Sequence, residues 1–232
     1  MIPEWIPKHP TLQNYINLFS NSNAIRWLFN SVFISTVTTA LIVLTSVLAA
    51  YAFAKIKFKG RDVIFLIYLS TLAFPAQMML IPRFTLFRTI GLYNTHWALI
   101  LPGMFTAFGT FMLRQFFMSI PEELSESAKI DGANHFTIFS KIILPLAVPA
   151  FSALIIFQFV SSWNEYESAL VYIRSKELAT IPLGLNFFKD ENASSYGAIM
   201  AASVCSLIPI FAVFLVFQKQ FVAGIATSGM KE

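Results

Sequence analysis

Residues 28–54 read LFNSVFISTVTTALIVLTSVLAAYAFA, and no charged side chain occurs between Arg26 and Lys55. A helix needs about 20 residues to cross the roughly 30 Å hydrocarbon core of a bilayer, at about 1.5 Å per residue. The Ser and Thr side chains inside the stretch can hydrogen-bond to the preceding helical turn, so lipid tolerates them. The stretch therefore predicts a transmembrane helix over 28–54.

Four more charge-free runs follow along the chain. They predict transmembrane helices at 63–81, 95–113, 143–163 and 197–218. Hydrophobic types make up 56% of the 232 residues and charged types only 12%, which is about half the charged share of a soluble domain. The surplus apolar surface has to face the lipid bilayer. The sequence thus predicts an all-α polytopic membrane protein with five transmembrane helices.

Proline occurs inside four of the predicted helices, at Pro75, Pro102, Pro149 and Pro209. Each proline removes one backbone donor, and neighbouring helices or water can satisfy the carbonyl group that is freed inside a membrane. Two outcomes are compatible with this pattern: an ordinary kink, or a broken helix that lines a path. Of the two, we expect kinks.

The orientation in the membrane follows from basic residues in short loops, which favour the cytoplasmic side. Residues 55–62, KIKFKGRD, hold four Lys and Arg, the densest such cluster in the chain. With this loop inside, the membrane core spans 26–218. The segments then expected in the cytoplasm are 114–141 and the tail 219–232, and those expected outside are 1–25, 83–96 and 165–196.

A structured polar segment, 119–145, separates the third and fourth predicted helices. Ser119 and Glu122 have the spacing of a capping box, with Pro121 close to the first helical position. The first helix should end at Asp131–Gly132, because glycine readily adopts the left-handed conformation that ends a helix. The pattern predicts a cytoplasmic helix-turn-helix with a fixed shape.

The second helix of this segment is expected to run from its N-cap, Asn134, to Ile143. On the first helix, Leu124 and Ala128 lie four residues apart on one face, with Ser127 beside them. Small residues there would allow another backbone to approach closely. The segment is therefore interpreted either as a docking element for a separate protein or as an amphipathic segment resting on the membrane surface.

Motifs for chemistry or for nucleic-acid binding are absent from the sequence. It contains no G-x-x-x-x-G-K-[ST] phosphate loop and no H-E-x-x-H zinc motif. His9, His96 and His135 are isolated, and Cys205 is alone in an apolar run. The 16 Lys and Arg are scattered through short loops, which argues against nucleic acid as a partner. We therefore predict no catalytic residue, no metal ligand and no cofactor.

An ion-coupled secondary transporter is the chief rival function, and a channel or scaffold subunit is the second. Coupling to protons or sodium usually needs ionisable side chains within the membrane. The cores of the five predicted helices contain no Asp, Glu, Lys, Arg or His, and Glu165 and Glu167 lie only at an outer edge. A channel or a scaffold would not need the structured segment 119–145. These observations favour a transport function driven by a partner protein.

The polar segment resembles the signature of the permease subunits of binding-protein-dependent ATP-binding-cassette (ABC) importers. That signature is a Glu-Ala-Ala triplet, a Gly after three residues, and Ile-x-Leu-Pro after nine more. It occurs here as Glu126–Ala128, Gly132 and Ile142–Pro145 with the same spacing. The one departure is Ser127 in place of the first Ala, and Ser is small enough to keep the close approach.

The resemblance extends over nearly the whole chain and is closest to the sugar importers of the maltose type. The stretches that carry it are TLQNYINLF (11–19), AKIDGANHFTIFSKIILPLAVPA (128–150), WNEY (163–166), IPLGL (181–185) and FVAGIATSGMKE (221–232). Members of this family usually have one more helix before the residues that match Thr11–Phe19. We therefore expect either an upstream helix or a reduced, five-span form.

The resemblance implies a single permease domain over 1–232 in the cytoplasmic membrane of a prokaryote. Such a subunit is not an enzyme, because separate subunits hydrolyse ATP. The implied partners are a second, related permease, two ATPase subunits and an extracytoplasmic sugar-binding protein. A permease for a non-sugar solute is the alternative within the same family.

The resemblance also implies which residues act. The coupling residues that would transmit closure of an ATPase to the membrane helices are Glu123, Leu124, Glu126, Ser127, Ala128, Asp131, Gly132, Ala133, Ile142, Leu144 and Pro145. Sugars are usually held by aromatic faces together with amide and hydroxyl groups. The candidates near the outer end of the fourth predicted helix are Gln158, Trp163, Asn164 and Tyr166, and anchoring at the membrane interface is their alternative role.

Overall fold

The computed structural model describes residues 11–21, 23–191 and 196–229, with side chains described there except at 21, 190, 191 and 221–229. Every regular element within these ranges is a helix, so the predicted all-α fold is confirmed. The expectations for residues 1–10 and for the end of the tail, 230–232, lie outside the described residues.

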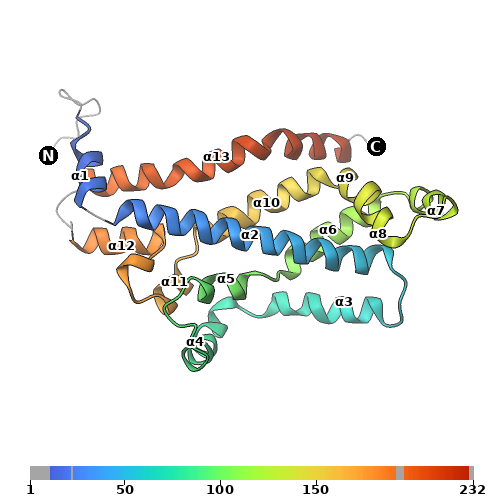
Figure 1. Cartoon of the computed structure of the whole chain (residues 1–232), viewed down its shortest axis with the longest axis horizontal. Coiled ribbons are helices and arrows are strands. Elements are labelled where there is room, and N and C mark those ends of the chain that lie inside the picture. Colours follow the sequence, from blue (N-terminus) through green and yellow to red (C-terminus); the bar gives the residue numbers. More distant parts are fainter. Residues whose placement is uncertain (1–10, 22, 192–195, 230–232) are drawn as a thin grey trace.

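The helices α2 (Ala24–Lys55), α10 (Val148–Trp163) and α13 (Tyr196–Gly229) run along the long axis of the molecule (Figure 1). The helix α10 lies between the other two and packs against both (Figure 1). Both α2 and α13 are continuous, as their charge-free runs predict. Pro209 lies inside α13, which continues past it.

The helix α2 also packs against α6 (Ala107–Ser119), through small side chains. Gly109 lies so close to α2 that a Cβ atom at this position would come within 2.7 Å of Ser46 Oγ. Small residues let helix backbones approach closely, which is how many helices associate in lipid. The buried Ser and Thr of α2 are Ser31, Ser35, Thr38, Thr39 and Ser46.

The second predicted helix, 63–81, is a broken span rather than a kinked one. Its elements are α3 (Arg61–Ser70), the 3₁₀ turns η1 (Thr71–Ala73) and η2 (Ala76–Met79), and α4 (Leu80–Thr89). The two halves are bent by 89°. The expected kink at Pro75 is therefore wrong. A residue before proline avoids the helical region, and Phe74 is accordingly extended at φ −84°, ψ 118°.

The third span comprises α5 (Trp97–Gly103) and α6, and together they cover Trp97–Ser119. Pro102 lies in the last turn of α5, just before the interruption. Thr106 then restarts the helix, because its side chain accepts a hydrogen bond from the backbone N–H of Gly109. The span therefore ends nearer the polar segment than the predicted boundary at 113.

The long helix of the fourth span, α10, begins at Val148, later than the predicted residue 143. The helical turns α8 (His135–Ile138), η3 (Phe139–Ile143, a π-helix) and α9 (Leu144–Leu146) precede it and are bent by 73° from α10. Pro149 lies at the start of α10, where a missing N–H costs no helical hydrogen bond. The described residues contain three helices able to cross a membrane, or up to five when each bent pair counts as one span.

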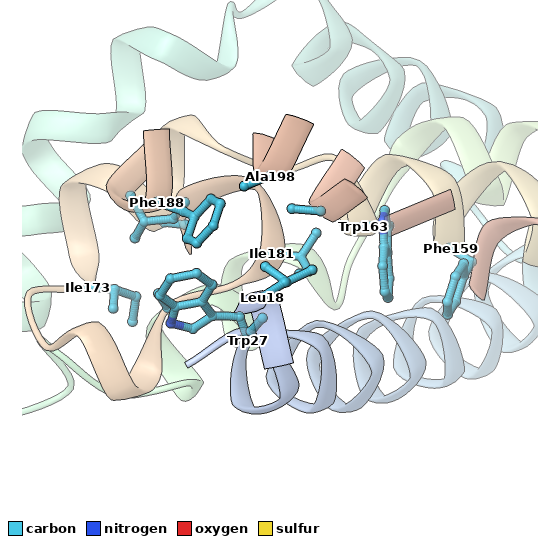
Figure 2. Close-up of a cluster of buried hydrophobic side chains, with 13 residues drawn as sticks. Leu18, Trp27, Phe159, Trp163, Ile173, Ile181, Phe188 and Ala198 are labelled. Carbon is cyan, nitrogen blue, oxygen red and sulfur yellow. The ribbon is translucent and has the colours of Figure 1, made fainter. Parts of the chain in front are cut away.

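Short helices close the end of the molecule opposite the polar segment (Figure 1). They are α1 (Gln13–Asn21), α11 (Glu167–Tyr172), η4 (Lys176–Leu178) and α12 (Ile181–Glu191). Figure 2 shows the apolar core that joins them to α2 and α10, with Trp27 and Trp163 among its members. The Trp27 indole N–H donates to the carbonyl of Lys176 at 2.7 Å, which fastens η4 to α2.

Candidate coupling segment and substrate cavity

The first helix of the polar segment is α7 (Glu122–Ile130), which projects beyond the bundle (Figure 1). The predicted capping box is wrong. The N-cap residue is Pro121, with no side-chain cap, and the Ser119 hydroxyl donates to the carbonyl of Phe116 at 2.8 Å. Ser119 is the last residue of α6, so its side chain bonds within that helix and does not reach α7.

The turn after α7 has the predicted conformation. Gly132 adopts φ +81°, in the left-handed region. The backbone N–H of Gly132 donates to Lys129 at 3.0 Å and that of Ala133 donates to Ala128 at 2.9 Å, which satisfies carbonyls at the end of α7. Asn134 caps the next helix, since its side-chain oxygen accepts from the N–H of Thr137 at 2.8 Å. Both predictions about this turn are confirmed.

The two sides of this segment have different surroundings. Ala128 and Ala133 are half-buried and pack against the apolar core at this end of the bundle. In contrast, Leu124, Ile130 and Phe136 expose 43%, 87% and 75% of their surface. Exposed apolar side chains of this size often mark a protein-binding surface. The small residue Ala128 thus faces the chain's own core. Ile130 and Phe136, which the sequence analysis did not name as coupling residues, lie on the outer surface with Leu124.

The remaining coupling candidates divide in the same way. Ile142 and Leu144 are half-buried against the same core, and between them Ile143 is completely buried. The exposed candidates are Glu123, Glu126, Ser127, Asp131 and Pro145. The Ile and Leu of the signature therefore hold the segment in place, and its polar members lie on the surface.

Two residues of α2 fasten the polar segment to the bundle. The Tyr51 hydroxyl donates to the carbonyl of His135 at 3.1 Å, and its ring lies 4.9 Å from that of Phe139 between centroids. The Lys55 ammonium donates to the carbonyl of Ile120 at 2.8 Å. Since α2 runs the length of the bundle, one helix connects this segment with the opposite end.

A buried arginine that the sequence analysis did not single out holds the neighbouring loop. Arg114 Nη2 lies 3.2 Å from Asp62 Oδ1, and its Nε donates to the carbonyl of Phe53 at 3.2 Å. Its guanidinium carbon lies 4.1 Å from the centroid of the Phe65 ring. These contacts join α2, α3 and α6 next to the polar segment. In the sequence, the only indication of this role of Arg114 was its position at the end of a charge-free run.

A cavity of about 360 Å³ lies among α2, η2, α4, α5 and α10. Its polar lining includes Thr38, Arg83, Gln158, Ser161, Ser162, Glu165 and Ser168, and Phe105 contributes an aromatic ring. The Glu165 carboxylate accepts from the backbone N–H of Ser168 at 2.8 Å, which fixes it at the start of α11. Polar groups from several helices converge here on one space large enough for a small ligand.

Of the four substrate candidates, Gln158 lines this cavity. Trp163 is 2% exposed and stacks on Phe159 in the apolar core, at 5.8 Å between ring centroids. Tyr166 is half-buried, and its hydroxyl accepts from the Asn186 amide at 2.5 Å. Asn164 is exposed. The structure therefore places only Gln158 at the cavity, because the other three point to the core or the surface of this end.

Among the described residues, no group of three His, Cys, Asp or Glu side chains could hold a metal ion. Of the cavity residues that sequence reasoning missed, Arg83, Glu165 and Ser168 come from segments that the charge pattern placed in loops, whereas Thr38, Ser161 and Ser162 lie within predicted transmembrane helices. The sharp turn of the broken span brings Arg83 to the cavity that Gln158 also lines.

Comparisons with known proteins agree on one family. Residues 42–227 match the family described as "Binding-protein-dependent transport system inner membrane component". Over 97% of its length the chain is 37% identical to the arabinooligosaccharides transport system permease protein AraQ of Halalkalibacterium halodurans, of which it covers 81%. It is 35% identical, over 97% of its length, to the galactooligosaccharides transport system permease protein GanQ of Bacillus subtilis, of which it covers 82%.

A solved structure is similar over almost all of the fold. It is that of a bacterial ABC transporter involved in the import of the acidic polysaccharide alginate. The likeness covers 93% of this chain and 81% of that chain, with a TM-score of 0.81 and 29% sequence identity. The resemblance to sugar-importer permeases that the sequence analysis identified is therefore confirmed.

Proposed function

The chain belongs to the family of inner membrane components of binding-protein-dependent transport systems, and on that premise we propose that it forms part of the membrane pathway of an oligosaccharide importer. The similarity to permeases for arabino- and galacto-oligosaccharides supports a sugar as the transported solute. The chain is a permease subunit and not an enzyme. ATP is hydrolysed by a separate subunit, and the complex lies in the cytoplasmic membrane of a bacterium.

The coupling element of this importer is the polar segment 119–145, docked on one of two ATPase subunits in the cytoplasm. One observation carries this proposal: α7 ends in a fixed turn, projects from the bundle and exposes Leu124, Ile130 and Phe136. Glu123, Glu126, Ser127 and Asp131 lie on the same exposed segment. Through the hydrogen bonds of Tyr51 and Lys55, a movement of the segment would be transmitted directly to α2.

The substrate path includes the polar cavity. The Gln158 amide can donate to and accept from sugar hydroxyls, the Glu165 carboxylate can accept from them, and the Arg83 guanidinium can donate to them. Phe105 offers an apolar face for a sugar ring. An extracytoplasmic sugar-binding protein would deliver the solute at the end of the bundle that carries α11 and α12, and a second permease would complete the path.

Gly132→Asp tests the coupling element. A side chain at φ +81° strains the backbone by about 1–3 kcal/mol, enough to misplace α7 while the membrane helices stay folded. Gly91→Asp is the matched control, because Gly91 also adopts a left-handed φ, of +76°, and likewise has no atom within 4 Å of an added Cβ. It lies in the loop at the opposite side of the membrane.

Each variant is co-expressed with the permease and the ATPase encoded beside it, purified in detergent and assayed for retained ATPase. We expect the wild type and Gly91→Asp to retain the ATPase and Gly132→Asp to lose it, with similar amounts of membrane-inserted chain. Retention of the ATPase by Gly132→Asp, with normal ATP hydrolysis, would contradict the proposal that this segment is the coupling element.

A further inference from the structure

Two buried threonines at the polar cavity have hydroxyl groups without a partner. Thr38 and Thr180 line this cavity and are only 4% and 5% exposed. Among the described residues, neither hydroxyl makes a hydrogen bond. A buried polar group without a partner costs free energy, so such groups are rare in native proteins. Because both hydroxyls border one open space, a ligand in that space can satisfy them.

Neither threonine bonds to the backbone group that lies within its reach. Thr38 lies inside α2, where a hydroxyl can bond to a carbonyl of the preceding turn, as the Thr45 hydroxyl does at 3.1 Å. Thr180 comes directly before α12, at the position where a threonine often caps a helix. The first N–H of α12, that of Ile181, donates to Ser31 Oγ at 2.7 Å. The two threonine hydroxyls therefore do not stabilise their own helices.

The segment that carries Thr180 is fixed against α2. The Asn30 side-chain amide donates to the carbonyls of Glu177 and Ala179, both at 2.9 Å, and Asn30 is itself buried. These bonds lie before Thr180 in the chain, and the bond to Ser31 lies after it. The place of Thr180 beside the cavity is thus set by buried contacts on both sides and does not depend on a ligand.

Two opposite charges also face the cavity, those of Arg83 and Glu165. In the described part of the chain, neither group forms an ion pair. Burial raises the pKa of the nearby Tyr172 hydroxyl, while the charge of Arg83 lowers it and that of Glu165 raises it. The two charges therefore lie close enough to act on one group. Both remain available to a ligand, and their sum is zero.

This set of groups fits a neutral sugar better than a charged one. The Arg83 guanidinium only donates hydrogen bonds and the Glu165 carboxylate only accepts them, whereas a sugar hydroxyl does both. An acidic sugar would bring in a negative charge that Glu165 repels, and the described lining holds no second cation to offset it. At about 360 Å³ the cavity is near the lower end of small-ligand pockets, about 300–1,000 Å³, so it holds a terminal unit and not a long chain.

We propose that this cavity is a binding subsite for the terminal unit of a neutral oligosaccharide, with the hydroxyls of Thr38 and Thr180 as its floor and Arg83 and Glu165 beside the sugar. This inference rests on the proposed function, which supplies an oligosaccharide as the transported solute. It adds that the chain itself selects the solute by its charge and does not leave that selection to the binding protein alone.

The neighbouring residue Thr39 provides a matched control. It is 5% exposed, and its hydroxyl likewise makes no hydrogen bond among the described residues. However, Thr39 lines an apolar groove beside α10 and α13 and not the polar cavity. Valine keeps the branched shape of threonine and removes the hydroxyl. Thr38→Val and Thr39→Val therefore make the same change at consecutive buried positions, of which only the first faces the proposed subsite.

Protection of a cysteine reports on binding in the assembled importer. Ser162→Cys places a thiol in the cavity lining, in a Cys205→Ser background. The chain is purified together with the permease and the ATPase encoded beside it. The rate at which a water-soluble maleimide modifies the thiol is measured with arabinotriose, galactotriose or maltotriose as neutral probes and with trigalacturonate as the acidic probe. The same complexes are reconstituted with the binding protein and assayed for uptake of each sugar.

We expect a neutral trisaccharide to slow the modification several-fold and trigalacturonate to have no effect. Thr38→Val should abolish the protection, whereas Thr39→Val and Thr38→Ser, which keeps the hydroxyl, should retain it. Equal protection by trigalacturonate would overturn the inference, and so would protection that survives in both Thr38→Val and Thr180→Val. If sugars are taken up but no neutral probe protects the thiol, the inference fails and the proposed function stands. If the wild-type complex takes up no sugar, the proposed function fails and the inference fails with it.

Discussion

The chain contains two sharp bends next to prolines, and they differ in what covers them. At the bend between α9 and α10, of 73°, the inner side is covered by the same chain: Ile143 and Ala147 are completely buried, while Leu146 and Val148 on the outer side are exposed. At the bend between η1 and η2, of 89°, every residue is exposed. A bend covered by its own chain folds with that chain, whereas an uncovered bend in a membrane has to be completed by another molecule.

Just before the buried bend, a change in helical pitch lets two isoleucines face the core together. Ile138 and Ile143 are five residues apart, which would place them about 140° apart around a regular α-helix. The π-helical turn Phe139–Ile143 widens the helix locally, with bonds spanning five residues. Both isoleucines are at most 1% exposed. The exposed bend has no such turn, and its Phe74 and Met78 remain on the surface.

The largest expected effect in this comparison is that of Ala147→Asp. It places a carboxylate at a site with 0% exposure and no paired charge, at a cost of about 3 kcal/mol or more. The isolated chain should lose much of its thermal stability in detergent, as measured by the fraction that stays monodisperse after heating. Ala147→Ser is the control and should lose far less. A stable Ala147→Asp chain would show that this bend is not held by its own core.

The same substitution at the other bend should have a different outcome. Ala73 is exposed at the end of η1, so Ala73→Asp should change the stability of the isolated chain in detergent by no more than about 1 kcal/mol. Binding of the second permease should instead weaken, because this partner would cover the exposed bend and bury the carboxylate in the interface. Co-purification of the tagged partner measures this. If Ala73→Asp unfolds the chain alone and leaves partner binding intact, the contrast between the two bends is wrong.

Sequence reasoning predicted the features that depend on composition or on one residue's conformation. The charge-free run ending at Lys55 predicted α2, and Gly132 and Asn134 predicted the turn after α7. The effect of a proline could not be predicted in this way. Pro209 remains inside a helix and Pro75 ends one, because the outcome depends on which neighbours satisfy the freed backbone groups.

The direction of the side chains at the candidate site was the other feature that the sequence could not predict. Gln158 and Trp163 lie on one helix, close in sequence, yet Gln158 lines the cavity and Trp163 packs in the core. The helical pattern fixes their relative direction but not which side the cavity is on. Arg83 reaches the cavity through the turn at Pro75, which the sequence predicted as a kink.

The smallest expected effect is that of Ser127→Ala, at the one position where the chain departs from the family signature. The Ser127 hydroxyl bonds only within its own helix, to the carbonyls of Glu123 at 2.8 Å and Leu124 at 3.3 Å. Alanine removes these bonds but favours the helix slightly, so the change should stay within about 0.5 kcal/mol. ATP hydrolysis and uptake by the reconstituted importer should match the wild type.

The result would distinguish two ways in which the polar segment could act: through the conformation of its backbone, or through direct contact of its polar side chains with the ATPase. If Ser127→Ala is silent while Gly132→Asp is not, the signature acts by fixing the backbone that presents Leu124, Ile130 and Phe136. A clear loss of coupling in Ser127→Ala would mean that this exposed hydroxyl touches the ATPase directly. The docking surface would then extend along the polar side of α7, away from those apolar residues, and the ATPase would approach the segment from a different direction.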